Sequence, residues 1–256
     1  MRFPHIPGID VAGTIAELGD GVEGWQTGTE VVAFLPMDTS GAAADYVLAP
    51  ANALAVAPRT VELADAAALP VGGLTAWQAL FDHAELRAGQ TVLINGAGGA
   101  VGGFAVQLAH QQGAHVTAVA SERHAERLRA DGADKVVGHL DHQASALTVA
   151  GQPFDVVLNL VRTSEADTAA LAELVRDGGV LLSTTTAPPE NPGRDIRTAS
   201  VFLLSKADQL AELVTRVDRG ELRINVAARR PLTELAAIHD AAVAGDLAGK
   251  TVLTPA

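Results

Sequence analysis

The chain has 256 residues, near the upper size for one hydrophobic core, so we expect one large α/β domain or two smaller ones. With 48% hydrophobic and only 19% charged residues, a disordered tail or a fibre is excluded. The 18 basic and 30 acidic residues leave a formal net charge of −12, which disfavours nucleic acid or an anionic membrane face as a partner. Because there is no cysteine, disulfides, thiolate nucleophiles and cysteine-based metal sites are excluded.

The N-terminal region predicts a small β unit. Short apolar stretches separated by glycine turns, DVAGTIAELG, GTEVVAFL and ADYVLAP, occupy residues 9–57 and indicate antiparallel strands. From Leu63 the apolar spacing becomes helical, through LADAAAL and LTAWQALFDHAEL. The opening residues lack the apolar region of a secretory signal, and no run reaches the ~18 apolar residues of a membrane span. We therefore expect a cytoplasmic protein with no membrane partner.

The middle of the chain alternates strands and helices. The predicted strands are 91–95, 116–120, 135–137, 155–160, 180–184 and 200–204, and the predicted helices are 101–112, 125–131, 165–175 and 206–219. These strands are continuous apolar runs followed by helices, which indicates a parallel sheet covered on both faces, the doubly wound α/β class. The stretch TTTAPPENPGRD at 184–195 predicts a long loop.

The C-terminal tail predicts a basic strand (VAARRPL), a helix at 233–244 and a final strand at 250–253. Because the middle domain is already complete, we expect this tail to pack back on the N-terminal β unit. The predicted domains are residues 1–75 with 226–256, and residues 76–225. We interpret Arg229-Arg230 as a salt-bridged strand end rather than an anion site.

The strongest functional signal is TVLINGAGGAVGG at 91–103, a strand that leads through glycines into a helix. Glycines at such a turn permit the chain reversal, the approach of a pyrophosphate and close helix–strand contact, while free N–H groups at the helix start bind the anion. Ala97 occupies the first glycine position, so the pattern is AxGxxG. The alternative is a tight turn without a ligand.

The end of the second strand bears on cofactor choice. NAD-preferring sites commonly have an acidic residue there, whereas this chain has Ser121, followed by Arg123 and Arg127. A serine with nearby guanidinium groups suits the 2′-phosphate of NADPH, whose dianion a carboxylate would repel. The alternative is that Glu122 binds the ribose hydroxyls while the two arginines are solvated surface.

Several segments together resemble the zinc-free quinone oxidoreductase (zeta-crystallin-like) branch of the medium-chain dehydrogenase/reductase superfamily. They are FPHIPGIDVAG, LPVGGLTAWQALF, AGQTVLINGAGGAVGGFAVQLA, GADKVV and RDGGVLLSTT. The resemblance covers nearly the whole chain. It implies a GroES-like catalytic domain, a Rossmann domain, NADPH as cofactor and a homodimer joined through an edge strand, here SVFLL at 200–204.

The resemblance also implies which residues bind the cofactor. It assigns the pyrophosphate turn to Gly99, Ala100, Val101 and Gly102, and the 2′-phosphate to Ser121 and Arg123. The other implied cofactor contacts are Thr75, His139, Asn159, Thr163, Thr184, Thr185 and Phe202. Thr75 and Thr184 could instead be caps or turn residues, and Phe202 ordinary core. Asn159-Leu160-Val161-Arg162 departs from the acidic-then-glycine loop that is usual in the family.

Zinc chemistry is disfavoured by the residues themselves. Where the zinc branch of the superfamily has a His-Glu pair after glycine, this chain has Gly8-Ile9-Asp10, and we predict no metal site. Without a Lewis acid a simple carbonyl or alcohol is a poor hydride partner. We therefore expect a small-molecule substrate, namely a quinone or an α,β-unsaturated carbonyl compound that receives hydride from NADPH.

The front of the chain departs from the family. Members normally carry a further N-terminal segment, which holds the first catalytic-domain strands and an Asn or Tyr beside the nicotinamide. If Met1 is the true start, no family proton donor can be mapped, and the catalytic residues stay unassigned. The alternative function is then a nucleotide-binding protein, or a degenerate reductase, that has lost catalysis with that segment.

Overall fold

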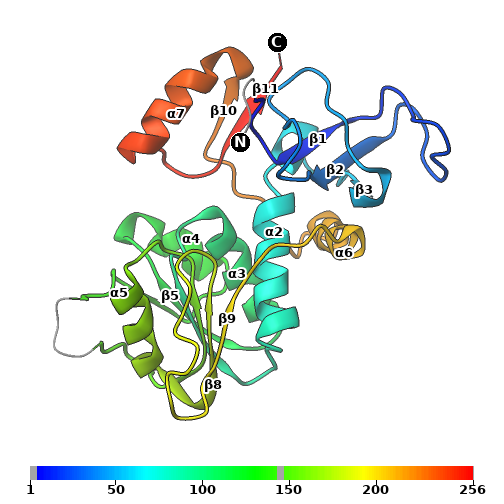
Figure 1. Ribbon diagram of the computed structural model, residues 1–256. Coiled ribbons are helices and arrows are strands. Elements are labelled where there is room, and N and C mark those ends of the chain that lie inside the picture. The colour runs from blue at the N-terminus through cyan, green and yellow to red at the C-terminus, as the bar shows by residue number, and fades with distance from the viewer. Residues whose placement is uncertain (1–4, 143–146, 256) are drawn as a thin grey trace. The chain divides into compact units, whose positions relative to one another are not determined.

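The computed structural model describes residues 5–142 and 147–255 (Figure 1). By their internal contacts they form two compact units. Unit 1 contains the residues up to Leu74 together with those from Leu204 onward, and unit 2 is Thr75–Leu203.

Unit 1 contains the antiparallel sheet predicted for the N-terminal region. Its strands are β1 (Asp10–Thr14), β2 (Glu30–Phe34) and β3 (Leu54–Val56), in the order β1-β2-β3. Four of the five β2 residues are buried, because β2 is the central strand of the sheet. The prediction of the third strand, at residues 44–50, was wrong. Residues 44–50 pair with no strand in the described part of the chain, and Leu48 there is 94% exposed.

Two ion pairs join the C-terminal segment of unit 1 to its N-terminal segment. The N-terminal segment continues with α1 (Leu63–Ala66) and α2 (Pro70–Trp77), whose last residues lie in unit 2. The C-terminal segment contains β10 (Ala228–Pro231), η5 (Leu232–Glu234), α7 (Leu235–Ala244) and β11 (Thr251–Thr254). Lys250 Nζ, beside β11, donates to Asp10 Oδ2 in β1. The Arg229 guanidinium donates to both carboxylate oxygens of Asp65 at 2.6 Å. Arg229 is therefore a salt-bridged strand end, as predicted.

Helix α6 (Ala207–Asp218) groups with unit 1. It contacts β3, and Asp218 Oδ1 accepts hydrogen bonds from the backbone N–H of Arg59 (2.7 Å) and Thr60 (3.1 Å). The sequence-based boundary at residue 225 assigned this helix to the other domain, so the division by contacts differs from that boundary, which stays a prediction.

Unit 2 is a doubly wound α/β domain, as the sequence predicted. Its strands are β4 (Thr91–Asn95), β5 (His115–Val119), β6 (Lys135–Val137), β7 (Phe154–Asn159), β8 (Val175–Ser183) and β9 (Arg197–Ser200). All neighbouring strands are parallel, in the order β6-β5-β4-β7-β8-β9. Because the chain runs outward from β4 in both directions, the strand order reverses between β4 and β7.

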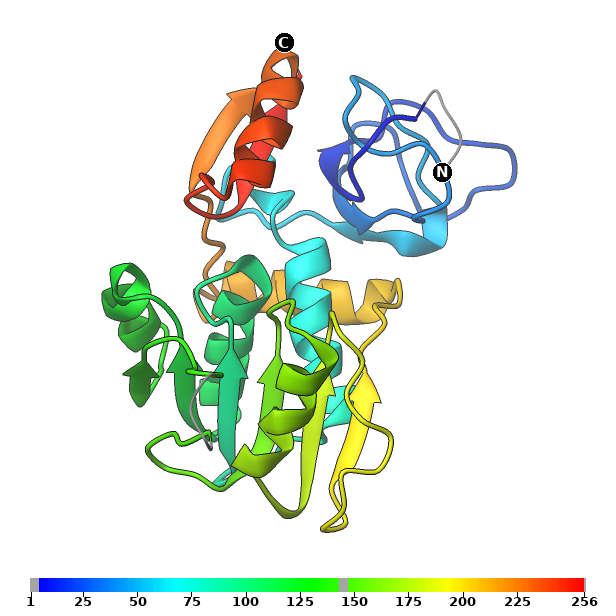
Figure 2. The same cartoon turned by 60° about the vertical axis from the view of Figure 1, so that its left-hand side comes forward.

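The helices of unit 2 lie on both faces of this sheet (Figure 2). They are η2 (Gln78–His83), α3 (Ala100–Gln111), η3 (Glu122–His124), α4 (Ala125–Ala130), α5 (Glu165–Ala170) and η4 (Leu171–Leu174). Leu93, Val157 and Leu181 are neighbours in register on three adjacent strands and are fully buried. Burial of apolar side chains on both faces explains why these strands are continuous apolar runs in the sequence.

The edge strand β9 differs from the prediction. It spans Arg197–Ser200 instead of 200–204, because its partner β8 ends at Ser183, which pairs with Ser200. Residues 201–206 have no regular structure, and Phe202 is 78% exposed. The interpretation of Phe202 as ordinary core is therefore wrong.

A carboxylate ties three strands together at the amino edge of the sheet. Asp155 Oδ2 accepts hydrogen bonds from Thr91 N and Oγ1, both at 2.7 Å, and Arg176 Nε lies 2.6 Å from Asp155 Oδ1. Burial raises the pKa of Asp155, but the hydrogen bonds from Thr91 and the charge of Arg176 outweigh it, so the pKa is lowered overall. Asp155 therefore stabilises the fold in its ionised form.

We expect Asp155→Asn to lower the free energy of unfolding by about 1–3 kcal/mol at neutral pH, because charge-assisted hydrogen bonds are lost. A lowered pKa in the folded state gives stability that is complete above the unfolded-state pKa and is lost as the pH falls through the folded-state pKa. The difference from the wild-type chain should therefore shrink below pH about 4. Urea unfolding across this pH range measures it. Asp177→Asn, which removes a carboxylate from an exposed ion pair with Arg194, is the control and should have little effect.

Candidate cofactor-binding site

The glycine turn joins β4 to α3. Gly96 has a φ of +90°, which a residue with a side chain rarely adopts. Its N–H and that of Ala97 both donate to the Val119 carbonyl, at 3.2 and 3.0 Å, and Gly99 N–H donates to Gly96 O at 3.1 Å. The end of β5 therefore holds the turn that follows β4.

The close packing of α3 against this turn requires a glycine at position 102. A Cβ on Gly102 would lie 2.5 Å from both Ala97 Cα and Gly96 O, closer than real contacts allow. Gly99 is different, because a Cβ there would meet only Gly96 O, at 3.5 Å. Gly99 is also exposed, so its small size is not needed for packing within the chain.

The start of α3 suits an anion. Gly99 is the N-cap residue and provides no side-chain cap. The first N–H groups of any α-helix, here those of Ala100, Val101 and Gly102, lack acceptors within the helix and carry the positive end of its dipole. Together with the exposed glycine beside them, they fit a pyrophosphate that approaches the backbone closely.

Ser121 and Arg123 follow β5. Ser121 is partly buried at the N-cap of η3, and its side chain makes no capping hydrogen bond. Arg123 is exposed, and its Nε donates to His124 Nε2 at 3.2 Å. Ser121 and Arg123 therefore lie at the end of the strand next to β4, where a Rossmann domain binds the adenosine ribose.

Arg127 supports the glycine turn. Its Nη2 donates to the Gly98 carbonyl at 3.0 Å, and its Nη1 lies 3.3 Å from the buried carboxylate of Asp131. The interpretation of Arg127 as solvated helix surface is therefore wrong.

His124 packs against the same turn. A Cβ on Gly98 would lie 2.5 Å from His124 Cδ2, so the imidazole edge occupies the space beside this glycine. Burial lowers the pKa of His124, and the like charges of Arg127 and Arg123 lower it further. The imidazole is therefore neutral at physiological pH, which agrees with its role as acceptor from Arg123.

A buried polar network lies at the carboxyl ends of three adjacent strands of the sheet. Asn95, Asn159 and Ser183 are the last residues of β4, β7 and β8 and are neighbours in register. Asn159 Oδ1 accepts from Asn95 Nδ2 (2.9 Å), and Asn159 Nδ2 donates to Ser183 Oγ (3.3 Å) and to the Val161 carbonyl (3.0 Å). Asn159 is 0% exposed. In this structure it supports the carboxyl edge of the sheet from within and does not line it.

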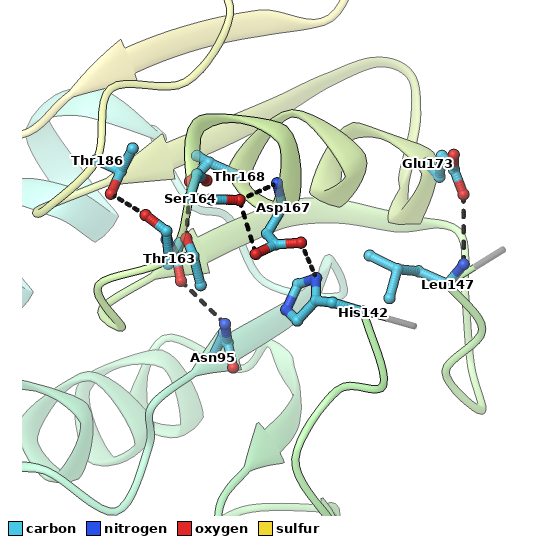
Figure 3. Close-up of polar contacts among 10 residues, drawn as sticks. Asn95, His142, Leu147, Thr163, Ser164, Asp167, Thr168, Glu173 and Thr186 are labelled. Atoms are coloured by element: carbon cyan, nitrogen blue, oxygen red, sulfur yellow. Dashed lines mark hydrogen bonds and ion pairs between the residues drawn. The ribbon is translucent and has the colours of Figure 1, made fainter. Parts of the chain in front are cut away.

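Three of the predicted threonines, Thr163, Thr184 and Thr185, lie on the loops after β7 and β8. Thr163 Oγ1 lies 2.7 Å from Thr168 Oγ1, and the Thr163 carbonyl accepts from Thr186 Oγ1 at 2.6 Å (Figure 3). Thr185 Oγ1 donates to the Val161 carbonyl at 2.8 Å, and the backbone N–H of Thr184 donates to Asn159 O at 3.1 Å. The bonds from Thr186 and Thr185 join the loop after β8 to the loop after β7.

Ten of the thirteen predicted site residues form two groups. Gly99, Ala100, Val101, Gly102, Ser121 and Arg123 gather at the ends of β4 and β5, while Asn159, Thr163, Thr184 and Thr185 gather at the ends of β7 and β8. Thr75 is buried on α2, His139 is exposed just after β6, and Phe202 is exposed after β9. Cofactor contacts of all these residues stay a prediction.

The sequence-based prediction missed Asn95, Ser183 and His124. Asn95 and Ser183 carried a signal, because each is a polar residue at the end of an otherwise apolar strand. His124 carried none, because its contact with Gly98 depends on how the η3 turn is placed. No group of three or more His, Asp or Glu residues suited to a metal ion occurs in residues 5–142 and 147–255. Within these residues no helix is long and apolar enough to cross a membrane.

A parallel sheet of this strand order, with a glycine turn at the point where the order reverses, defines a dinucleotide-binding α/β protein. Comparison with known proteins narrows this class. Residues 132–253 match the family described as zinc-binding dehydrogenase, and residues 1–59 match the alcohol dehydrogenase GroES-like domain.

Similar individual proteins point to one branch of that class. The chain is 30% identical to the chloroplast envelope quinone oxidoreductase homolog of Arabidopsis thaliana, over 99% of this chain and 81% of that protein. It is also 30% identical to the mitochondrial NAD(P)H oxidoreductase RTN4IP1 of Mus musculus, over 98% of this chain and 71% of that protein. The quinone oxidoreductase structure from Coxiella burnetii has a TM-score of 0.87 and 27% identity, covering 98% and 80% of the two chains.

The chain belongs to the quinone oxidoreductase branch of the medium-chain dehydrogenase/reductase superfamily. It is therefore an oxidoreductase. The α/β Rossmann-like unit and the GroES-like region that the sequence predicted are confirmed.

Two glycine substitutions separate packing from ligand binding at the turn. We expect Gly102→Ala to lower the free energy of unfolding by about 1–3 kcal/mol, because its Cβ would overlap the backbone of residues 96 and 97. Gly99→Ala should fold with nearly wild-type stability but bind dinucleotide more weakly, because the added methyl obstructs the approach of the pyrophosphate. Thermal unfolding and calorimetric titration with NADPH measure the two effects. Unchanged affinity in Gly99→Ala would contradict the assignment of this turn.

Proposed function

We propose that this protein is an NADPH-dependent oxidoreductase that transfers hydride to a quinone or an α,β-unsaturated carbonyl compound without a metal. The proposal rests on the site after β5. Ser121 there is small and neutral, Arg123 presents an exposed guanidinium, and the start of α3 follows the neighbouring strand β4. Such groups favour a 2′-phosphate, which an acidic residue at position 121 would repel.

Glu122 carries the alternative cofactor assignment. It is exposed in η3, one residue after Ser121. If its carboxylate bound the ribose hydroxyls, the site would prefer NADH. Direct comparison of the two cofactors separates these assignments.

A metal-free reaction is supported by the lack of residues suited to bind zinc. The chain has no cysteine. Asp10, in the segment where the zinc branch has a His-Glu pair, already binds within unit 1, because its Oδ1 accepts from Val71 N–H at 2.7 Å and its Oδ2 from Lys250. A conjugated acceptor spreads the charge that a Lewis acid would otherwise stabilise. Bound NADPH would supply the hydride.

Turnover of NADPH with a panel of quinones and enones, followed by absorbance, tests the proposal. We expect oxidation of NADPH in preference to NADH, and Ser121→Asp should reduce the preference at least tenfold because its carboxylate repels the 2′-phosphate. Ser121→Ala is the matched control for loss of the hydroxyl alone. Binding of NADPH by the folded chain without turnover of any acceptor would support the alternative, a nucleotide-binding protein without catalysis.

We also propose a cytoplasmic homodimer that forms along the β9 edge of the unit 2 sheet. Phe202, just beyond β9, is a large apolar side chain exposed to solvent, which favours burial against a second copy. We expect the wild-type chain to sediment as a dimer. Phe202→Asp should weaken dimerisation at least tenfold, as expected for loss of a buried aromatic side chain. Val243→Asp, at a position that is 91% exposed on α7, is the control, and a monomeric wild-type chain would contradict the proposal.

A further inference from the structure

Two basic side chains contact one glycine of the turn, and a third contacts one of the two. Arg127 Nη2 donates to the Gly98 carbonyl at 3.0 Å, the His124 ring edge fills the space beside Gly98, and Arg123 Nε donates to His124 Nε2 at 3.2 Å. The three residues come from η3 and α4, directly after β5. The turn and this basic cluster are therefore in direct contact.

The hydrogen bond from Arg123 determines the protonation of the imidazole. Because Arg123 Nε can only donate, His124 Nε2 must accept and carries no proton. The charged groups that face the ring are Arg123 from η3 and Arg127 from α4, while the glycine turn contributes none. Arg127 is also paired with the buried carboxylate of Asp131, at 3.3 Å. The charges of Arg127 and Arg123 both lower the pKa of the imidazole.

A phosphate dianion beside Arg123 would change this balance. It offers acceptor oxygens to the guanidinium and two negative charges to the imidazole, so the protonated ring becomes the favoured form. Protonated Nε2 can no longer accept from Arg123 and can instead donate to a phosphate oxygen. The ring gains one proton from solvent, which forms the Nε2–H bond, and no other bond forms or breaks.

We propose that His124 discriminates between phosphorylated and unphosphorylated adenosine ribose by taking up a proton when a 2′-phosphate binds. The proposal rests on the proposed NADPH site and adds a proton-linked specificity residue to it. It follows that affinity for NADPH decreases as the pH rises through the pKa of His124 in the complex, whereas affinity for NADH does not.

Calorimetric titration with NADPH and with NADH, in two buffers of different ionisation enthalpy, counts the protons. At pH about 7.5 the free 2′-phosphate is almost wholly dianionic, so proton uptake reports on the protein. We expect fractional uptake with NADPH and none with NADH. In His124→Gln the uptake should vanish, and the preference for NADPH over NADH should fall roughly tenfold, the effect of one charge-assisted hydrogen bond.

The control variant is His115→Gln, which changes an exposed histidine at the start of β5 and should retain both uptake and preference. The wild-type proton count needs no variant, so misfolding of His124→Gln would leave the test intact. Equal proton uptake for the two nucleotides in the wild-type chain, or an unchanged preference in a folded His124→Gln, would overturn the inference while the NADPH site stands. If neither nucleotide binds the folded wild-type chain, the proposed function fails as well.

Discussion

The parallel pairing of β4 with β5 on one side and β7 on the other is the constraint on which the site depends. Asn95 pairs with Val119 in β5 and with Asn159 in β7. The first register places the Val119 carbonyl where the N–H groups of Gly96 and Ala97 can reach it. The second brings the two asparagine side chains together at the end of the sheet. A slip of β5 against β4 would lose the support of the glycine turn, and a slip of β7 against β4 would lose the contact between the two asparagines.

The local charge of the site opposes the charge of the whole chain. A net charge of −12 would repel a nucleotide that carries several phosphates. The guanidinium groups of Arg123 and Arg127, together with the start of α3, place positive potential at the turn itself. Because Arg127 is bonded to the Gly98 carbonyl and to Asp131, part of this charge is fixed before any ligand arrives. Preorganised donors need no reordering when an anion binds.

The sequence predicted correctly those strands whose bounds are set by residues close to them in the chain. The bounds of β4 and β6 were predicted without error, because both strands lie between clear turn signals. The predictions that failed concern pairing between distant segments. Residues 44–50 have the alternation of a strand, but β3 forms at Leu54–Val56, and β9 ends at Ser200 because β8 ends at Ser183. Likewise, the burial of Asn159 depends on partners in two other strands, which no single segment reveals.

The sequence around Asp10 shows how a position can serve a different purpose in a related fold. In the zinc branch the corresponding segment carries a His-Glu pair, whereas here the carboxylate of Asp10 binds the N–H of Val71 in α2 and the ammonium of Lys250 beside β11. Asp10 and its two partners come from three parts of the chain that are far apart in sequence. An ion pair that is partly buried and also hydrogen-bonded to backbone is costly to break, because either remaining charge would be left without its partner. Asp10 therefore fixes the C-terminal segment to the N-terminal sheet of unit 1, which gives this carboxylate a structural reason to be present without any metal chemistry.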